Sequence, residues 1–193
     1  MPPKDLTKKE LIDILEIIEA ARSCTDPVQL KPLLLKAGEL VSADYSICGI
    51  VETQSGFVKG ISGVVNGNYP DEWFSHYISE RMYLRDPVVR HHASFSLAEF
   101  WTDIFKRSDP EAKPLISYAG DFGLRHGISS SVYMPGEGSF GIFAFSGPAD
   151  RFGKHHKSIV DIVTVHLSRA LLNSFSVSGR PLAREVSSGI QHL

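Results

Sequence analysis

Two pairs of strand-like segments, each joined by a short turn, constrain the fold of this 193-residue chain more than any other feature. The pairs span residues 45–52 with 57–65, and 128–134 with 140–145. Their β-branched and aromatic residues, bounded by turn residues at 53–56 and 135–138, are typical of β-hairpins. Gly60 and Gly63 interrupt one segment and predict a bulge or a close approach of another group.

Helical patterns flank and separate the two hairpins. Thr7 and Glu10 form a capping box, and Asp26 followed by Pro27 starts a second helix. The apolar face of the first helix is predicted to comprise Leu11, Ile14, Leu15, Ile18 and Ala21. Further helices are expected at residues 71–79, from 86, at 109–123 and at about 151–174. The pattern predicts an α+β fold, an α-β-α sandwich whose central antiparallel sheet of about five strands carries helices on both faces.

Charge and composition exclude several classes of protein. The formal net charge of −2 gives the chain no overall positive field to attract nucleic acid or anionic lipid. Cys24 and Cys48 form neither a disulfide framework nor a zinc pattern, which favours a reducing compartment. The polar N-terminus and the absence of an apolar run of about 20 residues argue against a signal peptide or a membrane span. We therefore expect a cytoplasmic protein.

Three motifs suggest chemistry, but each has a simpler interpretation. Residues 136–141 match G-x-G-x-x-G, yet a strand follows where a dinucleotide site needs a helix, so a hairpin turn is favoured. The histidine pairs 91–92 and 155–156 point apart within each pair, so solvated or capping histidines are favoured over a metal site. The serines at 129–131 lie in a predicted strand without an assigned base. We expect no catalytic residues, no metal site and no enzyme activity.

The most informative stretch begins at residues 68–77, with the sequence NYPDEWFSHY, and continues through DPVV at 86–89 to Phe100-Trp101. Asp86 before Pro87 is the usual start signal of a helix, so chemistry alone favours a cap over a ligand contact. Trp73 and Tyr77 lie four residues apart on a helix and could simply be core residues.

Taken together, these motifs resemble the autoinducer-binding domain of LuxR-type quorum-sensing regulators. The resemblance runs from about Leu11 to Leu172, and the segments 119–129 and 138–146 also fit it. It implies that the chain binds an N-acyl-homoserine lactone in a buried pocket, needs no cofactor, and forms a homodimer or a heterodimer with a related regulator. The implied ligand-binding residues are Tyr69, Trp73, Tyr77, Asp86, Val88, Trp101, Ser129 and Ala144.

The resemblance implies a role for each polar group. Trp73 is a donor only and maps to the lactone carbonyl, while the Asp86 carboxylate maps to the amide N–H and the Tyr69 hydroxyl to the acyl carbonyl. Trp101 and Tyr77 map to walls around the lactone ring and the start of the acyl chain. An unpartnered Asp86 would make the fold depend on ligand.

Two departures from the family leave alternatives open. Ala144 stands where many members have Ser or Thr, and Phe74 is polar in some, which leaves the identity of the signal open. Family members usually continue into a helix-turn-helix, for which the residues after Ser178 are too few. We expect residues 1–175 to form the sensor domain and 176–193 a flexible tail or truncated linker, without direct DNA binding by this chain. The alternative is a short LuxR-like protein that needs no lactone and inhibits a full-length regulator by heterodimerising with it.

Overall fold

A five-stranded antiparallel sheet forms the centre of the computed structural model, which describes residues 6–134 and 138–176. The strands follow the order β2-β1-β5-β4-β3. They are β1 (Tyr45–Gln54), β2 (Phe57–Asn66), β3 (Glu99–Phe100), β4 (Gly127–Tyr133) and β5 (Ser139–Ser146). The two predicted hairpins are therefore present, and β1 pairs with β5 to join them into one sheet.

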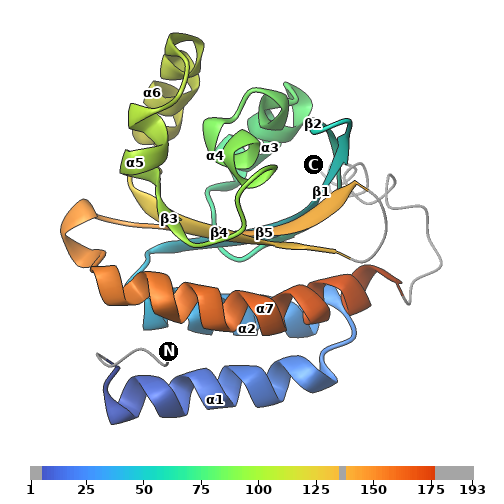
Figure 1. Ribbon diagram of the computed structural model, residues 1–193, viewed down its shortest axis with the longest axis vertical. Coiled ribbons are helices and arrows are strands. Elements are labelled where there is room, and N and C mark those ends of the chain that lie inside the picture. Colours follow the sequence, from blue (N-terminus) through green and yellow to red (C-terminus); the bar gives the residue numbers. More distant parts are fainter. Residues whose placement is uncertain (1–5, 135–137, 177–193) are drawn as a thin grey trace.

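Helices cover both faces of this sheet (Figure 1). They are α1 (Lys8–Ser23), α2 (Pro27–Leu40), α3 (Asp71–Ser79), α4 (Pro87–His92), α5 (Trp101–Lys106), α6 (Lys113–Asp121) and α7 (Lys154–Ser176). Short 3-10 turns are η1 (Met82–Leu84), η2 (Pro110–Ala112) and η3 (Ala149–Arg151). The predicted α-β-α sandwich is confirmed. Among the described residues, no helix has the length and apolar character needed to cross a membrane.

The two glycines that interrupt β2 lie at irregularities of the sheet. The register between β1 and β2 shifts once beside Gly63 and once beside Gly60, so the predicted bulge is confirmed at both positions. Gly63 also faces the ring of Phe175 from α7, and a Cβ at this glycine would lie 2.9 Å from that ring. The second glycine motif, at residues 136–141, leads into the strand β5 and not into a helix, as expected, although residues 135–137 lie outside the described part.

On one face, α2 and α7 pack below the sheet and α1 packs against them as the outermost layer (Figure 1). The predicted caps are present at the starts of α1 and α2. Thr7 and Glu10 form the capping box of α1, and the Asp26 side chain accepts from the Gln29 N–H at the start of α2. This layer encloses the main apolar core, whose largest members include Phe143, Phe145, Leu167 and Leu171.

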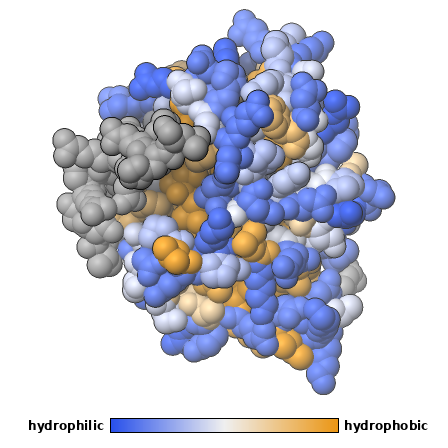
Figure 2. Space-filling model, turned by 180° about the vertical axis from the view of Figure 1, so that it is seen from behind, coloured by the Kyte–Doolittle hydropathy of each residue, from blue (hydrophilic) through white to orange (hydrophobic). Residues whose placement is uncertain are grey.

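Three expectations about the helices were wrong in detail. In α1 the buried face comprises Ile14, Ile17 and Ala21, whereas Leu11 and Leu15 are exposed, because α2 and α7 cover only one side of this outer helix. The segment 109–123 divides into η2 and the shorter helix α6. The last helix begins at Lys154 and not near residue 151, because the η3 turn precedes it. The surface seen from behind is mainly hydrophilic, with hydrophobic side chains in several small groups between the hydrophilic ones (Figure 2).

Phe143→Ala tests the importance of the core between the sheet and α7. The ring is fully buried, so we expect the free energy of unfolding to fall by about 3–5 kcal/mol. Phe57→Ala is the matched control, because that ring is 76% exposed and its loss should change stability by less than about 0.5 kcal/mol. Urea unfolding followed by circular dichroism measures both. Equal losses in the two variants would contradict this placement of the core.

Candidate ligand-binding site

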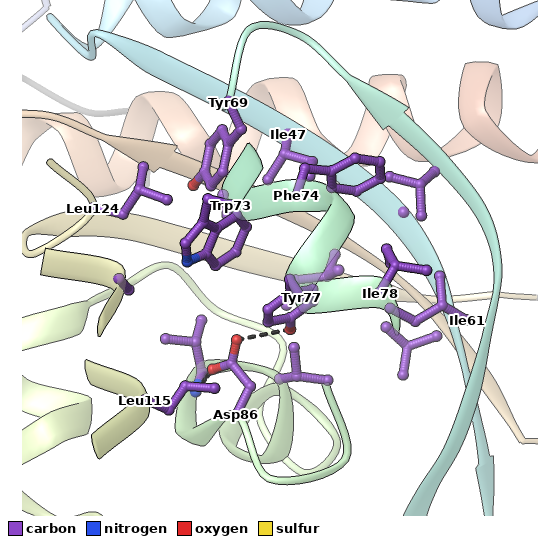
Figure 3. A pocket seen from close by; sticks show the side chains of 18 of the residues that line it. Ile47, Ile61, Tyr69, Trp73, Phe74, Tyr77, Ile78, Asp86, Leu115 and Leu124 are labelled. Carbon is purple, nitrogen blue, oxygen red and sulfur yellow. Dashed lines mark hydrogen bonds between the residues drawn. The ribbon is translucent and has the colours of Figure 1, made fainter. Parts of the chain in front are cut away.

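A cavity of about 100 Å³ lies between the upper face of the sheet and the layer of α3, α4, α5 and α6 (Figure 3). Its walls are almost entirely apolar, with side chains from β1, β2 and β5 below and from the four helices above. The lining residues that carry a polar side-chain group on this face of the sheet are Tyr69, Trp73, Tyr77, Asp86 and Trp101. A small number of polar groups in an apolar cavity is typical of a small-molecule site.

Three aromatic rings form one side of this cavity (Figure 3). Tyr69 precedes α3, and Trp73 and Tyr77 follow at helical spacing, so all three side chains face inward. Ring centroids are 5.5 Å apart between Tyr69 and Trp73 and 4.6 Å between Trp73 and Tyr77, which are stacked. Asn66 fixes the start of this series, because its Oδ1 accepts from the Tyr69 N–H at 2.8 Å.

The Asp86 carboxylate has two structural roles at once. Its Oδ1 accepts from the Val88 N–H at 2.8 Å and caps α4, while its Oδ2 accepts from the Tyr77 hydroxyl at 2.8 Å (Figure 3). The favoured expectation of a helix cap is therefore confirmed. Burial raises the pKa of Asp86 above its usual value, and the two hydrogen bonds act in the opposite direction. The lining of the cavity includes this carboxylate, so one residue joins the helix start to the cavity.

The Tyr69 hydroxyl is buried and has no hydrogen-bond partner among the described residues. Burial, and to a lesser degree the charge of Asp86, raise the pKa of Tyr69, so the hydroxyl keeps its proton. No described residue accepts a hydrogen bond from the indole N–H of Trp73 either. A buried hydroxyl without a partner costs about 1–3 kcal/mol. This hydroxyl would recover that free energy if an acceptor entered the cavity.

The structure brings seven of the eight predicted site residues together on the cavity wall. They are Tyr69, Trp73, Tyr77, Asp86, Val88, Trp101 and Ala144. Ser129 is not on the wall, because the Trp101 indole covers it and donates to its Oγ at 3.1 Å. Ser129 is fully buried and also lies 2.9 Å from His92 Nε2. Its predicted direct contact with ligand therefore does not agree with the geometry.

Sequence reasoning missed the part of the wall that comes from α6 and the outer side of α3. Leu115 and Ala119 face the cavity from α6, and Ile78 faces it from α3 together with Phe74, the only one of the four that the sequence analysis had related to the ligand. Both pairs show the four-residue spacing of a helix face, which was the available signal. The sequence alone does not say which layer such a face packs against.

The histidine pairs serve the fold. His92 and His156 are both buried, so the expectation of solvated or capping histidines was wrong for His92. His156 does act as a cap, since its Nδ1 accepts from the Gly153 N–H at the start of α7. Burial lowers the pKa of His92 to about 4, which keeps its ring neutral near pH 7. Within the described ranges, no three His, Cys, Asp or Glu side chains are grouped in a way that could hold a metal ion.

Comparison with solved structures identifies the fold. CepR2 from Burkholderia cenocepacia, described as an N-acylhomoserine lactone dependent LuxR family transcription factor, superposes with a TM-score of 0.66 at 19% identity, covering 86% of this chain and 98% of CepR2. SdiA from Escherichia coli superposes with a TM-score of 0.66 at 19% identity, covering 89% of this chain and 71% of SdiA. SdiA in complex with octanoyl-rac-glycerol superposes with a TM-score of 0.60 at 20% identity, covering 88% of this chain and 68% of SdiA. No curated protein sequence matches the chain.

The sequence itself matches the family model of the autoinducer binding domain over residues 29–171. This range begins in α2 and ends in α7, so it includes the whole sheet and every element that lines the cavity. The chain therefore belongs to the autoinducer-binding domains of LuxR-type regulators, which are receptors and not enzymes.

Proposed function

We propose that this chain binds an N-acyl-homoserine lactone, or an amphiphile with a similar acylated polar head, in the cavity beneath α3. The observation that carries the proposal is the buried hydroxyl of the lining residue Tyr69, a donor without a partner among the described residues, beside an otherwise apolar cavity. Trp73 and Asp86 line the same cavity. Two donors and one anionic acceptor within an apolar enclosure complement a ligand that has two carbonyls, one N–H and an acyl chain.

Each group has a distinct part in this proposal. Trp73 donates to the lactone carbonyl, Tyr69 donates to the acyl carbonyl, and Asp86 accepts from the amide N–H. The two hydrogen bonds that Asp86 already accepts leave lone-pair positions free, because a carboxylate offers about four. Tyr77, Val88, Trp101 and Ala144 supply apolar contact.

The relatives support the chemical class. CepR2 is described as dependent on N-acylhomoserine lactone, and SdiA is described in complex with octanoyl-rac-glycerol. Both ligands join an oxygen-rich head to an acyl chain. The built cavity also favours this function over a form of the protein that needs no ligand, because a fold without a ligand would gain by pairing or removing the Tyr69 hydroxyl.

We propose further that residues 1–175 act as one sensor domain that forms dimers through α1. Leu11 and Leu15 support this, since they lie one turn apart on the outermost helix and are 47% and 64% exposed. Leu15→Glu should weaken self-association at least tenfold in analytical ultracentrifugation, whereas Val28→Glu, at an 82% exposed site on α2, should not. Self-association that is unchanged by Leu15→Glu would place the dimer surface elsewhere.

Tyr69→Phe separates the two effects of the unpartnered hydroxyl. Without ligand, we expect the melting temperature to stay the same or to rise slightly, because the variant removes a buried donor that none of residues 6–134 and 138–176 accepts from. The affinity for N-octanoyl-homoserine lactone should fall about tenfold, since the donor to the acyl carbonyl is lost. Thermal melts and isothermal titration calorimetry measure the two quantities.

Tyr77→Phe is the control for this experiment. It removes one hydroxyl from the same wall but breaks the bond to Asp86, so it should destabilise the ligand-free protein. If saturating lactone leaves the melting temperature of the wild type unchanged, the proposed function fails.

Asp86→Asn tests the anionic acceptor. We expect lactone affinity to fall about 10- to 100-fold, because the hydrogen bond from the ligand N–H loses its charge assistance. Asp150→Asn, at an exposed position, should leave affinity unchanged.

The affinity for the lactone should depend on pH in a direction that the pKa of Asp86 defines. Burial raises the pKa of Asp86, so the carboxylate becomes protonated at a higher pH than an ordinary Asp. Wild-type affinity should therefore weaken as the pH falls from 7 through this raised pKa, and the slope should vanish in Asp86→Asn. Parallel pH profiles of the two proteins, recorded by fluorescence titration, would exclude Asp86 as the acceptor.

A further inference from the structure

The Ser129 hydroxyl is fully buried and hydrogen-bonded on both sides, although it lies on the strand face that looks toward the cavity. The Trp101 indole is a donor only, so Ser129 Oγ accepts its N–H at 3.1 Å. The hydroxyl proton of Ser129 is then free to go to His92 Nε2, 2.9 Å away. His92 Nδ1 lies 2.8 Å from the Phe95 carbonyl, which can only accept, so Nδ1 carries the ring proton. Every donor in this series has one acceptor.

The hydrogen bond from Trp101 to Ser129 holds the indole directly against β4. A Cβ at Gly127 would come within 2.7 Å of the indole ring, so only glycine leaves room for the ring at this point of the strand. Ser129 pairs across the sheet with Ala144, and cross-strand partners point to the same face. Ala144 lines the cavity, whereas the indole covers Ser129. The indole N–H points to the strand, and since an indole has no other polar atom, Trp101 lines the cavity with carbon atoms.

We propose that His92 and Ser129 hold Trp101 as an apolar wall, so that the cavity selects ligands without an oxygen in the segment that lies against this ring. The inference rests on the proposed function and extends it to specificity. Trp101, Val88 and Ala144 share one wall, and with Trp101 held in this way none of the three offers a free side-chain hydrogen-bonding atom. His92 does not touch the cavity and is a positioning residue.

The energetic consequence is a preference between ligands of equal chain length. In the binding mode that the family resemblance implies, the start of the acyl chain lies against Trp101, so a carbonyl there would be buried against this wall without a donor. Such an unpaired acceptor weakens binding by roughly tenfold. An unsubstituted acyl lactone is therefore favoured over its 3-oxo counterpart.

The Ser129–His92 pair does not indicate hydrolysis. A nucleophilic hydroxyl needs access to substrate, but Ser129 lies behind the indole and outside the cavity wall. Its oxygen already accepts the Trp101 N–H. The geometry fits a hydrogen-bonded support of the indole better than a nucleophile and its base. We call this arrangement of Trp101, Ser129 and His92 the clamp.

The first experiment measures the clamp without any ligand. The chain has 2 Trp, so the two indole N–H signals in a nitrogen-15 NMR spectrum can be assigned with Trp73→Phe. We expect the Trp101 N–H to exchange with solvent slowly in the wild type, and at least tenfold faster in Ser129→Ala and His92→Leu. His92→Gln should restore slow exchange because its Oε1 can accept from Ser129. His91→Gln, on the half-buried neighbour, is the control. Unchanged Trp101 exchange in Ser129→Ala and His92→Leu would overturn the clamp.

The second experiment measures the preference for the unsubstituted lactone over its 3-oxo counterpart. Isothermal titration with N-octanoyl- and N-(3-oxooctanoyl)-homoserine lactone gives the ratio of their two dissociation constants. We expect the wild type and His92→Gln to favour the unsubstituted lactone about tenfold. Ser129→Ala should reduce this ratio to about one, because the freed indole N–H can turn and donate to the 3-oxo group.

The outcomes separate this inference from the proposed function. A ratio of about one in the wild type, or an equal ratio in wild type and Ser129→Ala, would overturn the selection. If neither lactone binds the wild type, the proposed function fails. The exchange rates recorded without ligand then still decide whether His92 and Ser129 hold Trp101.

Discussion

The antiparallel pairing of β1 with β5 is the contact on which the rest of the structure depends. It runs from Tyr45 with Ser146 to Glu52 with Ser139, and it joins two hairpins that are far apart in the sequence. Closing such a long loop costs conformational entropy, which the pairing and burial of both strands must offset. Apart from the short edge strand β3, the chain between β2 and β4 covers one face of the sheet, and α1, α2 and α7 lie on the other (Figure 1).

The alternation of side chains along β5 links stability to ligand binding. Phe143 and Phe145 point into the core between the sheet and α7, whereas Ile142 and Ala144 point into the cavity. A shift in register by one residue would exchange these two sets. The pairing that builds the core therefore also fixes the floor of the cavity, and the site is formed by the central strands and not by a loop at the edge.

Local patterns in the sequence were enough for the elements, but not for the contacts between them. Hairpins, caps and helix faces depend on neighbouring residues, so the sheet and the capping residues Thr7 and Asp26 were predictable. The joint order of the aromatic and acidic motifs singled out Trp73, Asp86 and Trp101, which all line the cavity. The burial of His92 and the covering of Ser129 were not predictable, because they depend on which ring packs over which strand. The exposure of Leu15 likewise depends on an outer position that periodicity does not reveal.

The polar groups of the cavity are more informative when they conflict with folding than when they support it. Asp86 caps α4 and accepts from Tyr77, yet burial still disfavours its charge. The Tyr69 hydroxyl is buried without any partner among the described residues. Both features reduce the stability of the empty fold, and selection for stability alone would replace Tyr69 with Phe. A ligand that supplies an acceptor to Tyr69 and a donor to Asp86 would remove both penalties together. Affinity and fold stability then depend on the same few atoms, so binding is expected to stabilise the domain by mass action.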